Sequence, residues 1–278
     1  MNYRHVFHAG NFADVFKHCV LINLLFALQR KGKPFFFLDT HAGLGYYNLI
    51  SEAAKKACEF ESGINRLLAI NTEKLPLAVK KYLEIINQLN NNKAIQYYPG
   101  SPYCARSLLR PMDRMVACEL HPEDYLHLKQ VFVRDKQVQI QHENGYSSLK
   151  ALLPPKERRG LVLIDPPFEQ ENEYEQIRLS LQNGLKRWQT GIYAVWYPIK
   201  SGSPPSEYLS KLKEDLKTEI LLIEFCIDDR VAYQKLCACG MVIINPPFKM
   251  KEELAELLKF LWMALSPYQQ GFYRLKYL

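Results

Sequence analysis

Short, almost continuous runs of apolar residues recur along this chain and constrain its fold more than any other feature. Longer stretches with helical periodicity separate these runs. Strands that are apolar on both faces belong to a sheet covered by helices on both sides, and such sheets are mostly parallel. The sequence therefore predicts a seven-stranded α/β sheet, with strands at 35–39, 115–120, 138–141, 161–165, 193–197, 220–225 and 241–245.

The interval between the first and second apolar runs is too long for a single crossover. About 75 residues separate them, whereas a strand–helix–strand unit needs roughly 30. Residues 73–89 in this interval carry apolar side chains at helical spacing. We expect an inserted helical subdomain over 48–97, within a single domain that spans 1–278. A further helix is expected before the first strand, ending near Gly32 and Pro34.

Composition narrows the class of protein. No run approaches the roughly 18 uninterrupted apolar residues that a membrane helix needs, and the first residues lack the apolar core of a signal peptide. We therefore expect a cytoplasmic protein with no membrane partner. The seven cysteines form no paired CxxC units, which argues against a disulfide framework or a structural zinc. The net charge of +7 suits a polyanionic partner without requiring one.

Glycines and polar residues follow the first three predicted strands. Gly43 lies in the loop after the first strand, where a ligand binds in an open α/β sheet and glycine lets the backbone approach it closely. Glu119 ends the second strand, where a carboxylate can accept hydrogen bonds from both hydroxyls of a ribose. Asn144 and Gly145 follow the third strand and are candidates for contact with an adenine ring. Together they predict a nucleoside cofactor, and Asn48 at the third glycine position argues against NAD.

The tetrad Asp165-Pro166-Pro167-Phe168 is the most specific chemical signal. Its prolines remove two N–H donors and leave the Asp165 carboxylate and the Pro166 carbonyl as acceptors beside an aromatic ring. Such a site suits a flipped-out base with an amino group, which acceptors orient toward an electrophilic methyl group while Phe168 stacks on the base. A near copy of the tetrad occupies 245–248. We predict that only the tetrad at 165 is a working site, and that Phe248 packs in the core or at its rim.

Several longer motifs are similar to those of one enzyme family. The segments "YRHVFHAGNFADVFKH", "LDTHAGLG", "YYPGSP", "ELHP", "RRGLVLIDPPFE" and "WYPI" resemble the large-subunit ribosomal RNA adenine-N6 methyltransferase J family, from residue 3 to about 250. The resemblance implies a Rossmann-like class I methyltransferase fold with S-adenosyl-L-methionine as cofactor. It makes Asp165 catalytic and Tyr3 a contact to the RNA, and Phe168 stands where the family usually has tyrosine. The cofactor-binding positions that it implies are His18, His41, Ser101, Glu119, Asn144, Gly145 and Asp165.

The N-terminal helix also carries residues with more than one interpretation. His5, His8 and His18 with Asp14 could form a metal site, but histidines on helices more often pack or form hydrogen bonds, so we expect no metal. Lys17 is a candidate contact to the base or a phosphate, or else a solvated lysine. Basic and aromatic residues also interleave in the segments 158–160, 185–189 and 272–278, each of which is a weak candidate for contact with RNA.

These features predict a methyltransferase that acts on N6 of an adenine in large-subunit ribosomal RNA. Because the base must be reachable, we expect naked or partly assembled RNA as the substrate and no obligate protein partner. A DNA adenine methyltransferase is one alternative, although no sequence-reading module is visible. A non-catalytic RNA-binding protein on the same fold is another, and the intact Asp165, Glu119 and Gly43 count against it.

Overall fold

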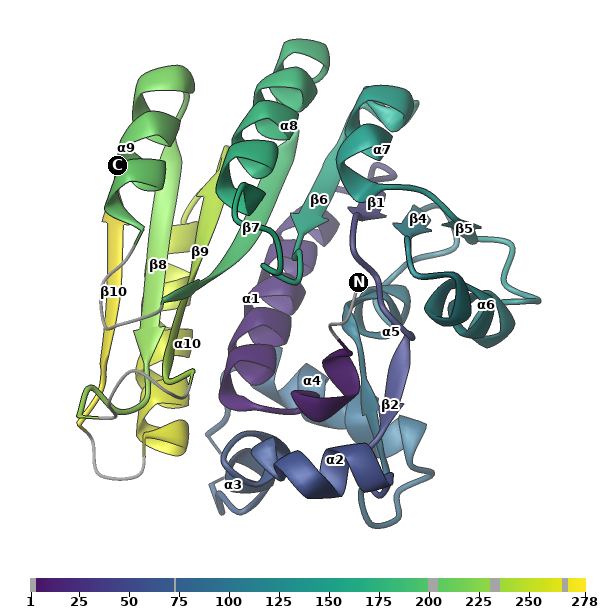
Figure 1. Cartoon of the computed structure of the whole chain (residues 1–278), viewed down its shortest axis with the longest axis vertical. Coiled ribbons are helices and arrows are strands. Elements are labelled where there is room, and N and C mark those ends of the chain that lie inside the picture. Colours follow the sequence, from purple (N-terminus) through teal and green to yellow (C-terminus); the bar gives the residue numbers. More distant parts are fainter. Residues whose placement is uncertain (1–3, 73, 200–204, 231–235, 267–269) are drawn as a thin grey trace.

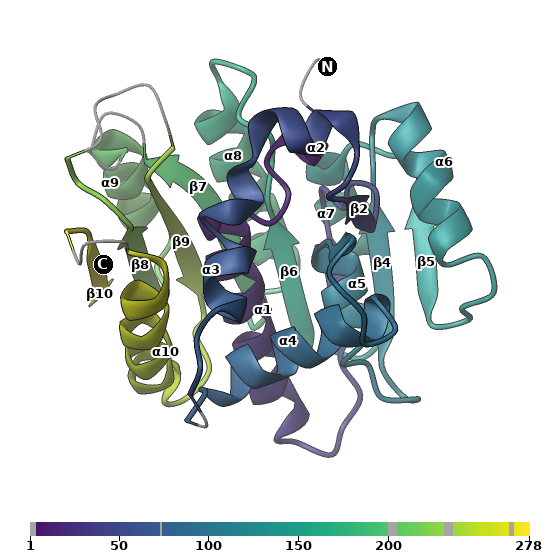
Figure 2. The same ribbon diagram turned by 90° about the horizontal axis from the view of Figure 1, so that it is seen from below.

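The structure is a computed structural model that describes residues 4–72, 74–199, 205–230, 236–266 and 270–278. Within these residues an eight-stranded sheet runs through the centre, with helices on both faces (Figures 1 and 2). The order of strands across the sheet is β10-β8-β9-β7-β6-β1-β4-β5. In chain order the strands are β1 (Phe36–Asp39), β4 (Arg114–Cys118), β5 (Val138–Gln141), β6 (Gly160–Ile164), β7 (Ile192–Ile199), β8 (Ile220–Cys226), β9 (Ala238–Ile244) and β10 (Phe272–Tyr277).

The seven predicted strands are present, with small shifts at their ends, and the sheet has an eighth strand that the prediction lacked. That strand, β10, is the outermost strand on one side of the sheet and pairs antiparallel with β8. Its sequence FYRLKY alternates basic with aromatic or apolar side chains, because an edge strand is only half buried. A search for continuous apolar runs therefore misses it. The segment 272–278, a candidate contact to RNA, is largely a strand of the sheet.

Helices bury both faces of the sheet in two hydrophobic clusters. One face packs against α1 (Phe12–Gln29), α5 (Ser101–Arg106), α6 (Pro122–Val131) and α10 (Met250–Leu265). The other face packs against α7 (Gly145–Leu152), α8 (Glu173–Arg187) and α9 (Ser206–Asp215). Figure 2 shows the two groups on opposite sides of the strands.

Helix α1 lies in the middle of its face, where the sheet, α4, α5 and α10 surround it. Of its 18 residues, 15 are buried. Among the described residues it is the one helix long and apolar enough to cross a membrane, with a mean hydropathy of 1.4, yet most of it is buried inside the protein. Its position in the core accounts for its apolar character.

In the long interval between β1 and β4, the described part of residues 49–96 contains four helical segments. They are α2 (Glu52–Ala57), η2 (Glu59–Glu61), α3 (Ile64–Leu68) and α4 (Leu77–Leu89). The strands β2 (Tyr46–Asn48) and β3 (Tyr97–Pro99) pair antiparallel at the two ends of this segment and bring them together. The buried side chains of α4 belong to the same cluster as those of α1, so the segment shares the main core.

Strand direction separates the two PPF loops. Strands β5, β4, β1, β6 and β7 are parallel, so their carboxyl ends meet at one edge of the sheet. Strand β9 is antiparallel to both β7 and β8 and ends at the opposite edge, as its arrow in Figure 1 shows. Asp165 and Asn245, which follow β6 and β9, therefore lie at opposite edges. The two loops cannot form one site.

The prediction that Phe248 packs in the core or at its rim is wrong, because its side chain is 83% exposed. Asn245 secures this loop instead. Its side-chain nitrogen donates to the carbonyl oxygens of Gln189 (2.8 Å) and Gly191 (2.7 Å), and its side-chain oxygen accepts from the Thr218 hydroxyl. Asn245 also has a left-handed backbone (φ 54°), which asparagine tolerates better than most residues. The loop is therefore held by hydrogen bonds rather than by an aromatic side chain.

Replacement of Asn245 by Ala should lower the free energy of unfolding by about 2 to 3 kcal/mol, because the variant loses these hydrogen bonds and keeps a strained left-handed backbone. Phe248→Ala is the matched control in the same loop and should change stability by less than about 0.5 kcal/mol. Urea denaturation of both variants measures the difference. Equal losses of stability would show that the aromatic ring is packed after all.

Candidate active site

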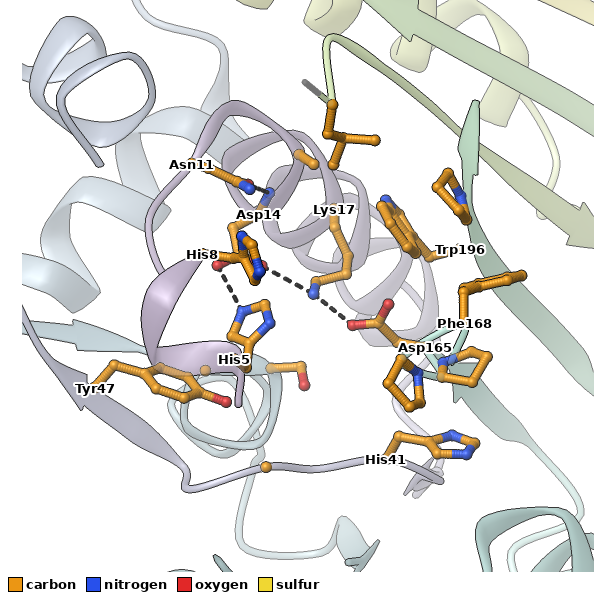
Figure 3. A pocket seen from close by; sticks show the side chains of 18 of the residues that line it. His5, His8, Asn11, Asp14, Lys17, His41, Tyr47, Asp165, Phe168 and Trp196 are labelled. Carbon is orange, nitrogen blue, oxygen red and sulfur yellow. Dashed lines mark hydrogen bonds and ion pairs between the residues drawn. The ribbon is translucent and has the colours of Figure 1, made fainter. Parts of the chain in front are cut away.

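A cavity of about 1230 Å³ opens at the edge where the parallel strands end. The amino-terminal turns of α1 form one wall, and the loops after β1, β4, β5 and β6 form the others (Figure 3). Tyr3, the expected contact to RNA, lies outside the described residues. The structure brings the other predicted site residues to this cavity: Lys17, His18, His41, Gly43, Ser101, Glu119, Asn144, Gly145, Asp165, Pro166 and Phe168.

Glu119 is held against the glycine loop that follows β1. Its two carboxylate oxygens accept from the backbone N–H groups of Gly43 (2.8 Å) and His121 (2.7 Å). Burial raises the pKa of Glu119, and these backbone hydrogen bonds oppose the rise. Gly43 has a φ of 64°, and a Cβ atom there would lie 2.3 Å from the Tyr47 hydroxyl. The loop thus requires glycine, and the carboxylate keeps acceptor capacity for a ligand in the cavity.

The loop after β5 brings the amino terminus of α7 against the loop after β1. The Asn144 side chain caps α7 by accepting from the Tyr146 N–H (2.9 Å). A Cβ atom at Gly145 would lie only 2.0 Å from the Thr40 carbonyl oxygen. Gly145 is therefore required for this close approach, which places the start of α7 beside Gly43 and Glu119 in the cavity wall.

Lys17 joins α1 to the tetrad. Its ammonium group forms ion pairs with Asp14, at 2.9 Å, and with Asp165, and all three side chains are buried or nearly so. Burial alone would lower the pKa of Lys17, but the two carboxylates outweigh it and hold the pKa well above its usual value. Lys17 is thus charged and fixes the orientation of Asp165. The alternative that Lys17 is a solvated lysine is wrong, because it is only 5% exposed.

Asp14 is a site residue to which the sequence alone gave no role. It accepts from the Gly10 N–H (3.0 Å) and pairs with His5 at 2.9 Å, besides Lys17. Burial would raise its pKa, but the charges of His5 and Lys17 hold the pKa well below its usual range. In the described part of the chain, no group of three or more His, Cys, Asp or Glu side chains is placed to hold a metal ion. The sequence did contain a signal for the pairing of Asp14 with Lys17, because residues three apart on a helix are neighbours on its surface.

Two of the histidines that line the cavity, His18 and His41, are neutral near neutral pH. Burial lowers the pKa of His18 to about 3 and that of His41 to about 4. The Nδ1 atom of His18 is hydrogen-bonded to the Tyr98 hydroxyl at 3.0 Å, and that of His41 is 2.8 Å from the Thr40 hydroxyl. Both therefore serve as hydrogen-bonding groups rather than as cations near neutral pH.

Aromatic side chains surround the tetrad. Phe168 has a left-handed backbone (φ 52°), and its ring centroid lies 5.0 Å from that of Tyr174 and 5.9 Å from that of Trp196. Trp196 lies on β7 and faces the cavity, as Figure 3 shows. Sequence reasoning noted its "WYPI" motif without giving Trp196 a role, because no local signal tells which face of a buried strand a residue occupies. Phe168 and Trp196 form an aromatic wall beside the Asp165 carboxylate.

Comparison with known proteins identifies the family. A family described as "Ribosomal RNA large subunit methyltransferase D, RlmJ" matches residues 32–278. The chain belongs to this family. It is 42% identical to ribosomal RNA large subunit methyltransferase J of Haemophilus influenzae and 40% identical to the Escherichia coli protein of the same name. Each match covers 98% of this chain and 96% of the relative.

A solved structure shares the fold of this chain over almost its whole length. The crystal structure of a Legionella pneumophila protein matches with a TM-score of 0.88 and 38% identity, covering 97% of this chain and 98% of that one. The two proteins therefore share the fold that places the tetrad, the glycine loop and Glu119 around one cavity in this chain.

Replacement of Lys17 by Met should lower the free energy of unfolding by about 3 to 5 kcal/mol at neutral pH, because Asp14 and Asp165 would remain buried without their cation. In the wild-type protein the stabilisation from Asp14 is fully present above its unfolded pKa of 3.8 and disappears as the pH falls through its lower folded pKa. The difference in free energy of unfolding between the variant and the wild type should therefore be smaller in acid than at neutral pH. Urea denaturation at about pH 7 and about pH 3 measures this difference.

Lys211→Met is the control for this variant, because Lys211 pairs with Glu207 on an exposed surface. Its stability should stay within about 0.5 kcal/mol of the wild type at both pH values. A Lys17→Met variant that unfolds like this control would contradict the buried ion-pair network.

Proposed function

We propose that this protein transfers a methyl group from S-adenosyl-L-methionine to N6 of an adenine in large-subunit ribosomal RNA. As a member of its family, the chain is a methyltransferase of large-subunit ribosomal RNA that uses this cofactor. The choice of an adenine amino group rests on the position of Asp165, Pro166 and Phe168, whose acceptors and ring lie in the same cavity as the glycine loop and Glu119. We also place the enzyme in the cytoplasm, where ribosomal RNA is accessible.

The cavity fits the cofactor by the chemistry of its walls. The oxygens of Glu119 keep lone pairs for the two ribose hydroxyls, and Gly43 and Gly145 leave the backbone open at the positions where a Cβ atom would clash. The loop that holds Asn144 and Gly145 would contact the adenine ring. His18, His41 and Ser101 would supply neutral polar groups along the rest of the cofactor. When bound, S-adenosyl-L-methionine supplies a methyl group on a positively charged sulfur.

Asp165 and its neighbours would orient the target base for direct transfer. The Asp165 carboxylate and the Pro166 carbonyl accept the two amino hydrogens and point the nitrogen lone pair at the methyl carbon. As the N–C bond formed, the bond between the methyl carbon and the cofactor sulfur would break and leave that sulfur as a neutral thioether. The amino nitrogen would become positive, the carboxylate would stabilise that charge, and one proton would then leave to solvent. Phe168 stacks on the base and keeps it out of the RNA helix. Positioning and electrostatics, rather than a strong base, would lower the barrier.

Lys17 fixes the orientation of Asp165. The ammonium group binds Asp165 from the α1 side, so one oxygen of Asp165 is committed to the ion pair. The other oxygen remains for the amino group of the base. Lys17 can also contact the base itself or its phosphate, as expected for its place on the cavity wall.

The direct test offers the enzyme radiolabelled S-adenosyl-L-methionine with protein-free large-subunit ribosomal RNA, partly assembled and mature large subunits, DNA and free adenosine. The expected product is N6-methyladenosine at one position in the ribosomal RNA, identified by mass spectrometry after nuclease digestion. Naked or partly assembled RNA should be the better substrate, and no other protein should be required. Label in DNA alone, or on another atom of the RNA, would overturn the proposal.

Replacement of Asp165 by Ala should abolish methyl transfer, with a loss of at least 100-fold (roughly 3 kcal/mol of transition-state stabilisation), because the amino group loses its charged acceptor. Affinity for RNA should change little, since phosphate contacts distributed over the surface supply most of it. Single-turnover methylation and filter binding separate the two effects. Activity within tenfold of the wild type would remove Asp165 from the reaction.

Replacement of Glu119 by Gln should weaken cofactor binding by about 1.5 to 3 kcal/mol, or roughly 10- to 150-fold in Kd, because the ribose hydroxyls lose a charged acceptor. Isothermal titration with S-adenosyl-L-methionine measures the change in the absence of RNA. Glu207→Gln is the control, because the Glu207 side chain lies on the exposed surface of α9, and this variant should leave Kd unchanged. The same Kd in both variants would exclude Glu119 from the cofactor site.

A further inference from the structure

Two motifs that the active site does not use converge at the opposite edge of the sheet. One is the second PPF loop, which ends in the exposed Phe248, and the other is the basic and aromatic segment at the end of β10, where Tyr277 is 46% exposed. Neither ring lines the catalytic cavity. Large aromatic side chains at such exposure contribute little to the fold, so their presence on one edge needs another explanation.

A basic side chain accompanies each ring. The Lys249 ammonium group lies 5.6 Å from the Phe248 ring centroid, and the Lys251 ammonium group lies 5.0 Å from that of Tyr277. Lys249 and Lys251 both stand at the start of α10, so the two ring–lysine pairs lie at the same end of that helix. Arg30, at the end of α1, donates to the Phe248 carbonyl oxygen at 3.3 Å and adds a third cation on the Phe248 side. We call Arg30, Phe248, Lys249, Lys251 and Tyr277 the basal surface.

The loop that carries Phe248 is rigid. Pro246 and Pro247 restrict its backbone, and the Asn245 side chain anchors its start to the loop before β7. At the end of the loop, Lys249 adopts a left-handed backbone conformation (φ 63°) and occupies the N-cap position of α10. A ring held outward on such a loop loses little conformational entropy when it binds a partner.

We propose that the basal surface is a second RNA-binding site, at which Phe248 and Tyr277 stack on unpaired bases while Lys249, Lys251 and Arg30 contact the phosphates that flank them. The inference rests on the proposed function, since it assumes that RNA is the substrate. Exposed aromatic rings with adjacent cations are the combination that binds single-stranded nucleic acid, because every base offers a face for stacking and every linkage carries a negative charge.

The local charges favour stacking as the main contribution. Glu253 pairs with Arg30 at 2.5 Å, and Glu219 and Glu252 lie near the Tyr277 hydroxyl. These carboxylates reduce the positive potential of the basal surface, so attraction to a plain duplex backbone is weak there. Unpaired bases, which the two rings can reach, fit the surface better than a continuous RNA helix does.

The position of the basal surface determines which RNA can use it. The basal surface and Asp165 lie at opposite ends of the strands. Strand β6 has five residues and is therefore roughly 15 Å long, and the loops at both ends add to this separation. A short hairpin that carries only the target adenine reaches one edge of the sheet. A long, folded ribosomal RNA reaches both, so the basal surface should add affinity for long RNA and leave the chemical step unchanged.

The test compares the double variant Phe248→Ala/Tyr277→Ala with the wild type on two RNAs. One is a full-length transcript of the large-subunit RNA, and the other is a short hairpin around the methylated adenine, once that position has been mapped. For the transcript, Kd from filter binding without cofactor should rise at least tenfold, in line with the stacking of one or two bases. For the hairpin, Kd, KM and kcat should stay within twofold. A transcript Kd within twofold of the wild type would overturn the inference.

Two further variants sharpen the result. Lys249→Gln/Lys251→Gln should make the binding of the transcript less dependent on salt, because fewer counterions are released. Met263→Ala, which removes another exposed apolar side chain of α10, is the matched control and should bind like the wild type. Melting curves should be nearly the same for all of these variants, since none of the replaced side chains is buried.

The outcomes distinguish this inference from the proposed function. If the wild type neither binds nor methylates ribosomal RNA, the proposed function fails. If the wild type does both and the basal variants match it, only the second RNA site fails. A wild type that forms dimers at micromolar concentration, together with a monomeric Phe248→Ala/Tyr277→Ala variant, would overturn the inference in favour of a contact between copies of this chain.

Discussion

The ion pairs of Lys17 hold the architecture of the active site together. Lys17 lies on the first turns of α1, and through Asp165 it connects that helix to the end of β6, 148 residues later in the chain. The same ammonium group binds Asp14, which in turn orients His5 and the backbone at Gly10. Because Lys17 and Asp14 are buried, each depends on its ion pairs to remain charged. The N-terminal segment, the core helix and the tetrad at 165–168 therefore form one unit.

Strand direction gives nearly identical loops different properties. An aspartate after β6 lies in the cavity because β6 is parallel to β1, β4 and β5, and the loops at the carboxyl ends of those strands also line the cavity. An asparagine after β9 lies at the other edge because β9 is antiparallel. There its amide forms hydrogen bonds with neighbouring loops and leaves Phe248 exposed. The same tetrad thus builds a cavity wall in one place and an exposed aromatic loop in the other.

Much of the fold and of the candidate site could be predicted, because both depend on local signals. Continuous apolar runs identified seven strands, and the residues just after them, such as Glu119 and Asp165, line the cavity as expected. The eighth strand could not be found in this way, since only one face of β10 is covered. The pairing of Lys17 with Asp165 was also out of reach, because it joins elements far apart in the sequence.

By itself the sequence determined the class of fold and the edge of the sheet at which the candidate site lies, because both follow from residue types at fixed spacing along the chain. The resemblance of several longer motifs indicated the family. Only the tertiary structure decided which strands are antiparallel, and hence that Asn245 lies far from Asp165. It also decided that Lys17 is buried between two carboxylates and that Phe248 is exposed. The physical reason is that burial and ion pairing depend on distances through space, which local periodicity does not contain.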